Sequence, residues 1–400
     1  MKKFFAKDEF KILGGFYLER FVAHLIYFAP AFWIIFFNET LNLTQISILF
    51  AILCVSNFIF EIPTGAIGDL WGRKVSTLFA YIMMGLLLPT FIFVTNFYHL
   101  MGLFALWGLF RTFHSGSRDA WIIDNLKYYK KSNLINTYYL KEHSFIHFGM
   151  FLSGLLGAYI VATLGINAIW IFAGLSWIIS LLFLLPVKEH KLTKNETVSF
   201  RTLYKQSKTA IRYSLKHQVL LFILLATFFI TFRHSFGRDI IWQPFLRDLG
   251  LPIYAFGLLF SAYTLLGSIA PIVAKPLLKI LKTEKKYFIF LLVLGMILNF
   301  GVVFVNTFMI GIIFMLAMIF LLHLFMPINN AFIHAFIPSK TRATIISFKS
   351  AIVSLAYAIS YPIAGFFADR FGTQSTIMFG GIFLIPAIYF YLKMNPTIKR

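Results

Sequence analysis

The 400-residue chain is 59% hydrophobic and 19% aromatic, only 13% of its residues are charged, and its formal net charge is +21. A mean hydropathy of +0.80 excludes an ordinary water-soluble domain. The basic residues lie in short segments between apolar runs, a pattern typical of membrane topology, so we do not expect nucleic acid as a partner. The single cysteine, Cys54, leaves no disulfide framework or metal cluster, and we expect it to serve core packing.

A bilayer crossing needs about 20 mostly apolar residues, and the chain contains twelve such runs. We therefore predict an all-α integral membrane protein with twelve transmembrane helices. The expected spans are 12–37, 43–67, 75–95, 98–124, 142–163, 166–186, 218–241, 253–274, 287–306, 308–336, 343–367 and 375–392.

The positive charges predict the orientation. With the N-terminus inside, most of the 36 Lys and Arg fall in inward segments, whereas the outward loops hold only Arg247 and Arg370, with Arg238 near a span end. By the positive-inside rule both termini are expected in the cytoplasm, with the protein in an inner or plasma membrane. Acidic residues follow the basic start of the chain, so we expect no cleavable signal peptide and a retained first span.

A compact charged turn follows the second span, at residues 65–74 (Gly-Ala-Ile-Gly-Asp-Leu-Trp-Gly-Arg-Lys). Its glycines allow two helix ends to approach closely and turn sharply. The turn resembles the signature loop of major facilitator superfamily transporters (G-x-x-x-D-x-x-G-R-K/R). The longer string 61–74 is similar to that of the drug:proton antiporter branch.

The resemblance implies two pseudo-symmetric six-helix bundles and a gating latch that holds one face closed. In that family a carboxylate at the inner end of the fourth helix pairs with the signature arginine. The latch residues would be Gly65, Asp69, Gly72, Arg73, Lys74 and Asp124. The alternative for Asp124 is an acidic helix end in water. The chain departs from the branch on the fifth helix, where Gly149, Gly154 and Gly157 occur without the expected proline.

In the resembled family, helices 1, 4, 7 and 10 line a central cavity, and in this chain each carries polar residues at helical spacing. Arginine and histidine dominate these faces, which favours a substrate that carries a carboxylate or another anionic group. The predicted substrate-binding residues are Arg20, His24, Arg111, His114, Arg118, His234, Arg238, His323 and Asn330. The alternative is that these side chains pair internally, for instance Arg118 with a nearby carboxylate.

Proton coupling requires a group that changes its charge during the transport cycle. Buried carboxylates or a histidine could do so. The candidates are Glu19, Glu61, Asp119, Glu142 and His147. Two alternatives stay open: a membrane histidine can be a hydrogen-bonded packing residue, and Glu61 can serve the latch.

The only composition break, 187–217, divides the chain into an N-terminal six-helix bundle (1–186) and a C-terminal one (218–400). We predict a basic cytoplasmic linker with an amphipathic helix on the membrane surface, the alternative being a flexible linker. A second turn-like stretch, 365–372, resembles the signature loop but falls on the outside by the span count. We expect it to be a helix-packing and turn element.

Together these patterns predict a secondary transporter that works by alternating access, with proton-coupled efflux of a small amphipathic, anionic compound as the favoured function. The alternatives are an importer or facilitator of an organic anion and a non-transporting receptor or scaffold. No enzyme motif is present, and we expect no cofactor or metal. The expected partners are the solute, protons and the lipid bilayer, and we expect a monomer.

Overall fold

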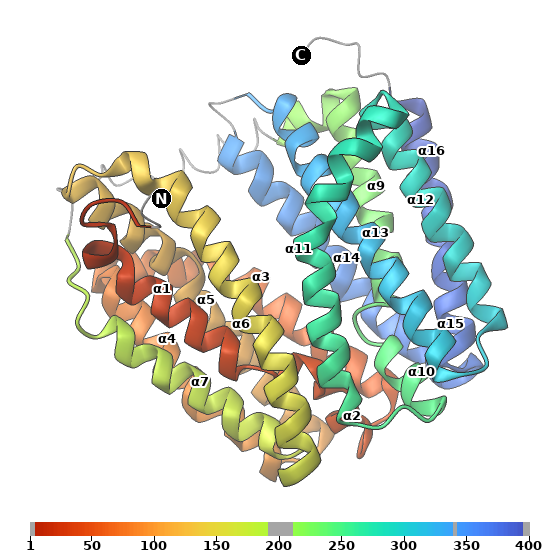
Figure 1. Ribbon diagram of the computed structural model, residues 1–400, viewed down its shortest axis with the longest axis horizontal. Coiled ribbons are helices and arrows are strands. Elements are labelled where there is room, and N and C mark those ends of the chain that lie inside the picture. The colour runs from red at the N-terminus through yellow and green to blue at the C-terminus, as the bar shows by residue number, and fades with distance from the viewer. Residues whose placement is uncertain (1–4, 191–210, 339–341, 395–400) are drawn as a thin grey trace. The chain divides into compact units, whose positions relative to one another are not determined.

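The computed structural model describes residues 5–190, 211–338 and 342–394, and within these ranges it is helical with no β-strand (Figure 1). Ten helical segments there are long and apolar enough to cross a membrane. Two further helices fall on the remaining predicted spans: α5 (Phe97–Tyr128), which carries more charge, and α7 (Ala168–Leu184), which is 17 residues long. The predicted all-α membrane architecture is therefore confirmed.

Besides α5 and α7, eight elements precede the central segment. They are α1 (Glu9–Ile26), η1 (Ala29–Ala31), α2 (Trp33–Asn38), α3 (Leu43–Trp71), α4 (Arg73–Leu87), η2 (Leu88–Phe93), η3 (Ser132–Leu134) and α6 (Ile135–Leu164). The first predicted span is therefore two helices and a 3-10 turn. The break begins at Tyr27, whose backbone leaves the helical region, and Pro30 follows within η1.

The second half has the same alternation of long helices and short turns. Its elements are α9 (Gln218–Ser235), α10 (Trp242–Asp248), α11 (Ala255–Leu281), α12 (Glu284–Gly301), η4 (Val302–Phe304), α13 (Phe308–Ala335), α14 (Arg342–Phe371), α15 (Thr373–Gly380), η6 (Gly381–Phe383) and α16 (Leu384–Lys393). The last predicted span is broken at two adjacent glycines, Gly380 and Gly381, where α15 passes into η6.

Backbone contacts divide the chain into two compact units. Unit 1 contains residues 1–40, 55–195 and 252–264, and unit 2 contains residues 41–54, 196–251 and 265–400. One boundary between the units falls within the central segment, and α3 and α11 each contribute one end to either unit. The division into bundles 1–186 and 218–400 stays a prediction. The predicted amphipathic helix falls mainly on residues 191–210, outside the described residues.

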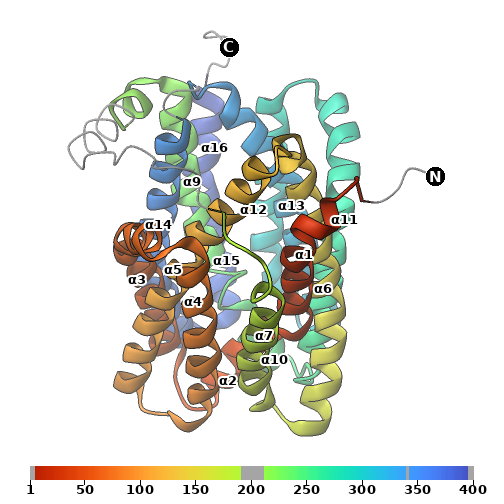
Figure 2. The same cartoon turned by 90° about the vertical axis from the view of Figure 1, so that its left-hand side faces the viewer.

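In unit 1, α1 packs against both α6 and α7, and α4 packs against α5 and α7 (Figures 1 and 2). Aromatic side chains fill the space between α1 and α5: the rings of Phe16 and Trp121 meet edge to face with centroids 5.0 Å apart, and Tyr17 stacks on Tyr138 of α6 at 5.1 Å. This core fixes the three helices that carry the buried charges described below.

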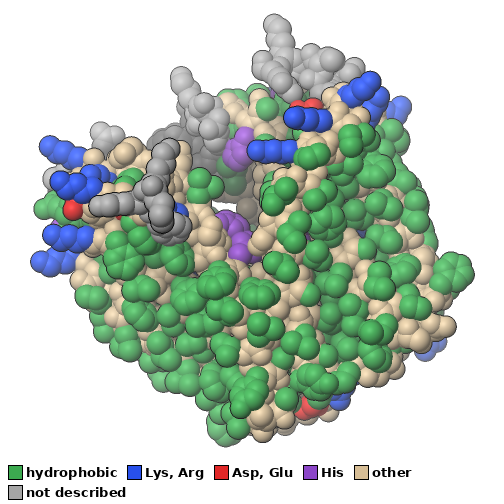
Figure 3. Space-filling model, viewed as in Figure 1, with side chains coloured by type: hydrophobic (Ala, Val, Ile, Leu, Met, Phe, Trp, Pro, Cys, Tyr) green, Lys and Arg blue, Asp and Glu red, His purple; other side chains and the backbone are tan. Residues whose placement is uncertain are grey.

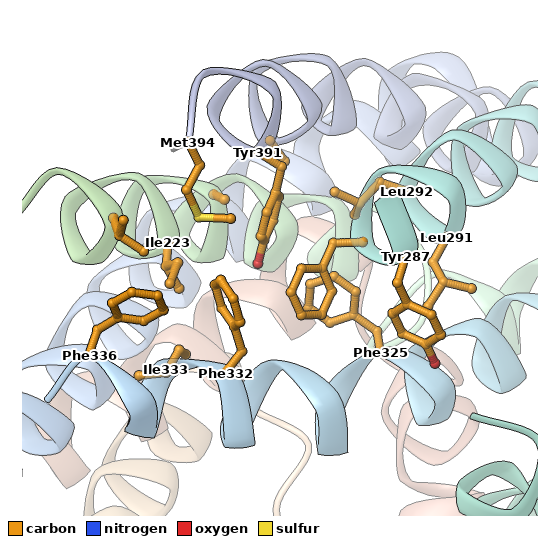
Figure 4. Close-up of a cluster of buried hydrophobic side chains, with 14 of the residues drawn as sticks. Ile223, Tyr287, Leu291, Leu292, Phe325, Phe332, Ile333, Phe336, Tyr391 and Met394 are labelled. Carbon is orange, nitrogen blue, oxygen red and sulfur yellow. The ribbon is translucent and has the colours of Figure 1, made fainter. Parts of the chain in front are cut away.

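Unit 2 has a core built from α9, α12, α13 and α16 (Figure 4). The rings of Phe288, Phe325 and Tyr391 contact one another across three of these helices. The buried phenols are satisfied, since Tyr287 donates to the Leu324 carbonyl and Tyr391 to the Asn329 side-chain oxygen, each over 2.9 Å. Leu291 and Leu292 lie at one end of this cluster and also line a cavity.

Hydrophobic side chains cover most of the visible face of each unit, and Lys and Arg side chains gather toward one end (Figure 3). Large apolar residues such as Phe93, Phe304 and Leu70 are about four-fifths exposed. A water-soluble surface would not leave so many of them uncovered, whereas lipid tails solvate them well.

Candidate functional site

The turn after α3 is held by a glycine with a backbone conformation that other residues rarely adopt. Gly72 has φ 105° and precedes α4, so the chain reverses there within one residue. Gly68 is equally constrained, because a Cβ at that position would lie 2.4 Å from the Ser117 hydroxyl of α5. Gly65, by contrast, has open space beside it.

Arg73 is the centre of the predicted latch. Its guanidinium pairs with Asp124 at the end of α5, as the resemblance implies, and lies 3.9 Å from the exposed carboxylate of Asp69. This contact ties the start of α4 to α5 within unit 1. Its gating role stays a prediction.

A second set of hydrogen bonds, which the sequence did not predict, holds the same turn. Glu189, just after α7, accepts hydrogen bonds from the backbone N–H groups of Arg73 (2.8 Å) and Lys74 (3.2 Å). The Lys74 ammonium in turn donates to the carbonyls of Leu185 and Val187 at the end of α7. An acid at a helix start and a cation at a helix end both match the helix dipole. Glu189 stood in the segment that composition marks as linker, so no pattern pointed to it.

Four charged residues of α1, α5 and α6 form a buried cluster in unit 1, and Arg118 lies at its centre with no exposed surface. Its guanidinium contacts Glu19 through Nε (2.9 Å) and Nη2 (2.7 Å), and Glu142 through Nη1 (2.7 Å). The predicted substrate-binding residue Arg118 is thus internally paired, the alternative that the sequence left open.

Arg20 completes the cluster and is its most accessible member. Its Nε donates to Glu142 Oε1 over 3.1 Å, and about a fifth of its side chain is exposed. Two tyrosines add neutral donors: Tyr138 bonds to Glu142 (2.9 Å) and accepts from Arg118 (3.0 Å), and Tyr81 bonds to Glu19. Two carboxylates and two guanidinium groups therefore balance, in a region where an unpaired charge is costly.

The other predicted residues of unit 1 surround this cluster at different depths. His24 bonds to the Arg20 carbonyl over 2.8 Å, and His114 packs its ring against Tyr81 and Trp177. Arg111 is exposed, and Asp119 is half exposed with an oxygen 3.7 Å from Arg118.

Two proton-coupling candidates lie apart from the cluster. Glu61 accepts from the Ser115 hydroxyl over 3.0 Å, which joins α3 to α5. His147 stacks on His143 with ring centroids 5.0 Å apart. Neither contacts Glu19 or Glu142 through any bond recorded among the described residues, so the structure brings together three of the five candidates, Glu19, Glu142 and Asp119.

Unit 2 places its polar residues differently. His234 is buried near the end of α9, while the half-exposed Arg238 pairs with its neighbour Asp239 at 3.2 Å, and Tyr361 donates to that carboxylate over 3.4 Å. On α13, His323 lies against Gly267 of α11, and Asn330 is exposed and accepts from Lys349. These four predicted residues do not form one cluster in the described part of unit 2.

Arg233, which sequence reasoning passed over as a site residue, is the buried cation of unit 2. Its side chain is 6% exposed and its Nε has no hydrogen-bond partner among the described residues. The available signal was an arginine inside an 18-residue apolar helix, but the polar row predicted for span 218–241 ran through His234 and Arg238, and Arg238 lies beyond the end of α9.

The second turn-like stretch, 365–372, forms a turn and a packing contact, as expected. Gly372 has φ 84° and precedes α15, and a Cβ on Gly365 would lie 2.4 Å from the Leu43 carbonyl. Asp369 caps the start of α3, accepting from the backbone N–H groups of Leu43 (3.0 Å) and Thr44 (2.8 Å).

Within residues 5–190, 211–338 and 342–394, no three His, Cys, Asp or Glu side chains come together as a metal site would require. The chemistry of the buried cluster is that of protons and ion pairs, and its exposed edge at Arg20 can bind a carboxylate in a charge-assisted bond.

Comparison with known proteins covers nearly the whole chain. A family model described as Major Facilitator Superfamily matches residues 17–237 and 239–400. An uncharacterised MFS-type transporter of Bacillus subtilis (strain 168), YxaM, is 25% identical over 389 residues, which is 93% of this chain and 92% of that protein.

Solved structures share the fold. A POT family transporter in complex with 5-aminolevulinic acid has a TM-score of 0.74 at 14% identity, covering 97% of this chain and 96% of its own. The nucleoside transporter NupG gives 0.69 at 14% identity (96% and 100%), and a bacterial homologue of the lysosomal transporter Spinster gives 0.71 at 12% (96% of each).

Proposed function

This chain belongs to the Major Facilitator Superfamily, and from that premise we propose that it couples proton movement to the transport of a small amphipathic compound bearing a carboxylate. A transporter of this type needs no enzyme chemistry.

The observation that carries the proposal is the shared oxygen of Glu142. Its Oε1 accepts from Arg118 (2.7 Å), Arg20 (3.1 Å) and Tyr138 (2.9 Å). Protonation of Glu142 removes the negative charge that holds Arg20, while Arg118 keeps its second carboxylate, Glu19. Arg20 is the accessible guanidinium of the cluster and keeps only a 4.0 Å contact with Glu19, so it becomes the group available to bind an incoming carboxylate.

This arrangement links the proton and the anion positively. Each favours binding of the other, because Glu142 and the solute carboxylate compete for the same guanidinium. Positive linkage is the requirement for symport, in which both ligands cross together. The geometry therefore supports co-transport of a proton and an organic anion as the first candidate.

Efflux by antiport is the second candidate, and the similarity of residues 61–74 to the drug:proton antiporter branch favours it. In that case the latch of Arg73 and Asp124 would hold the inner face closed during part of the cycle. We expect both termini in the cytoplasm, since most basic residues lie in the segments assigned to that side. We also expect a monomer.

Proteoliposomes with an imposed pH gradient test the proposal. Labelled aromatic carboxylates, quaternary amines and uncharged nucleosides are offered outside, and a dye reports the internal pH. Symport predicts uptake of a carboxylate from an acidic exterior with acidification of the lumen. Antiport predicts uptake only when the lumen is the acidic side. Carboxylate movement that ignores both gradients would contradict proton coupling.

The variant E142Q then tests the site. Glutamine cannot change its charge, so pH-driven accumulation should fall by about tenfold or more while solute exchange at equal pH continues. The matched control is E9Q, because Glu9 is another buried carboxylate of unit 1 and pairs with Lys141 at 2.7 Å, away from Arg20. Unchanged accumulation in E142Q would overturn the role of Glu142.

A further inference from the structure

We propose that unit 2 contains a binding site for one small monovalent anion, a halide or a carboxylate group, at Arg233 and His234 of α9. This site does not depend on the proposed function, because it involves a different cluster and is tested without transport. It lies at a cavity in the core of unit 2.

The cavity lies among α9, α12, α13 and α16 and holds about 40 Å³ of space for water-sized occupants. Among the described residues that line it, the polar side chains are those of Arg233 and His234, and leucines and Phe325 form most of the rest of its wall. Leu291, Leu292 and Phe325 belong to the core cluster in Figure 4, so the cavity is the end of that core. One water needs about 10–15 Å³ by this measure, so the space admits a halide or a carboxylate end and excludes a whole metabolite.

The charge of Arg233 is not balanced by the groups around it. Arg233 is 6% exposed as a residue, and its Nε lacks a hydrogen-bond partner in the described part of the chain. The acid that follows α9, Asp239, pairs with Arg238 at 3.2 Å and accepts a hydrogen bond from Tyr361. These three charged residues leave a net charge of +1.

Arginine side chains keep their proton in proteins, so Arg233 cannot avoid the cost of burial by becoming neutral. A bare buried cation is costly, and natural proteins pair such groups or supply a bound ion. An anion in the cavity would accept from Arg233 and could accept a second bond from His234, whose ring lines the same space. The apolar wall would strengthen both bonds by excluding water.

Thermal unfolding of the full-length protein in detergent tests the site. Sodium chloride is titrated against sodium gluconate at constant ionic strength, since gluconate is too large for the cavity. The expected result is a saturable rise of the unfolding midpoint by about 2 °C or more with chloride, bromide or acetate, and none with gluconate. A midpoint that does not respond to small anions would overturn the proposal.

The variant R233M should lose this response, because methionine fills similar space without the charge. The matched control R247M, an exposed arginine of α10 in the same unit, should keep it. If R233M fails to fold, equilibrium binding of ³⁶Cl⁻ to the unaltered protein still decides the question. One saturable chloride per chain supports the site, and no saturable binding overturns it.

Competition identifies the source of the anion. A transported carboxylate that displaces ³⁶Cl⁻ would assign the site to the solute. Retained chloride at saturating solute would assign it to a resident inorganic ion. Both results support a small-anion site, and loss of transport in E142Q has no bearing on either.

Discussion

Arg118 and Arg233 are both buried guanidinium groups on membrane helices, and the two units treat them in opposite ways. Arg118 has two carboxylates within 2.7 Å and a tyrosine at 3.0 Å. Arg233 has a cavity and a histidine. Unit 1 therefore balances its buried cation with its own side chains, and we propose that protonation of Glu142 shifts that balance. In unit 2 the balancing charge is proposed to come from a bound anion.

The largest effect is expected where the internal pairing is broken. R118M leaves Glu19 and Glu142 buried without their shared cation and should destabilise the protein by about 3–5 kcal/mol. R233M removes a cation without stranding an acid, so in gluconate its stability should be equal to or above that of the unaltered protein. Denaturant unfolding in detergent measures both. Equal losses in the two variants would remove the distinction between the units.

Restoring neutrality provides a control for that experiment. In the double variant E19Q/R118M the cluster is neutral again, with Arg20 still paired to Glu142 at 3.1 Å, so most of the stability lost in R118M should return. A double variant as unstable as R118M would indicate that packing around Arg118, rather than charge, accounts for the loss.

A smaller effect is expected at the tyrosines that support the charges. Tyr138 bonds to both Glu142 and Arg118 at 2.9 and 3.0 Å, so Y138F should cost about 1.5–3 kcal/mol. Tyr361 reaches Asp239 only at 3.4 Å, so Y361F should cost about 0.5–1 kcal/mol. The same unfolding measurement compares them, and a larger loss in Y361F would contradict the tighter balance assigned to unit 1.

The smallest difference between the units is expected in the backbone of their turns. Gly72 and Gly372 have similar positive φ angles, 105° and 84°, so G72A and G372A should each cost about 1–2 kcal/mol. A Cβ added at Gly72 would lie 3.0 Å from the Glu189 carboxylate. A Cβ added at Gly372 would have no described atom within 4 Å. G72A should therefore be somewhat the more destabilised. The reverse order would show that Glu189 does not constrain the turn.

The fold was predictable from the sequence because its signals are long and local. Apolar runs and basic connections mark the helices without knowledge of their partners. The exceptions are the helix breaks after Ile26 and at Gly380 and Gly381. These breaks lie inside hydrophobic segments, so the hydropathy of the sequence does not reveal them.

The site was only partly predictable, since spacing places a residue on a helix face but gives no depth. Arg111 and Arg118 share a face of α5, yet one is exposed and the other fully buried. Arg118 meets Glu19 and Glu142 across 99 and 24 residues of chain, and those contacts depend on how α1 and α6 pack. Arg233 was passed over because it lies one position away from the polar row of its helix.

The exchange of helix ends between the units bears on how this chain can be divided. Helix α3 changes unit after Cys54 and α11 after Thr264, so the first half of the chain lacks residues 252–264 of its own unit and the second half lacks 41–54. Half-proteins severed at the central segment would each be incomplete. Co-production should rescue both, and neither is expected to survive alone in a cell.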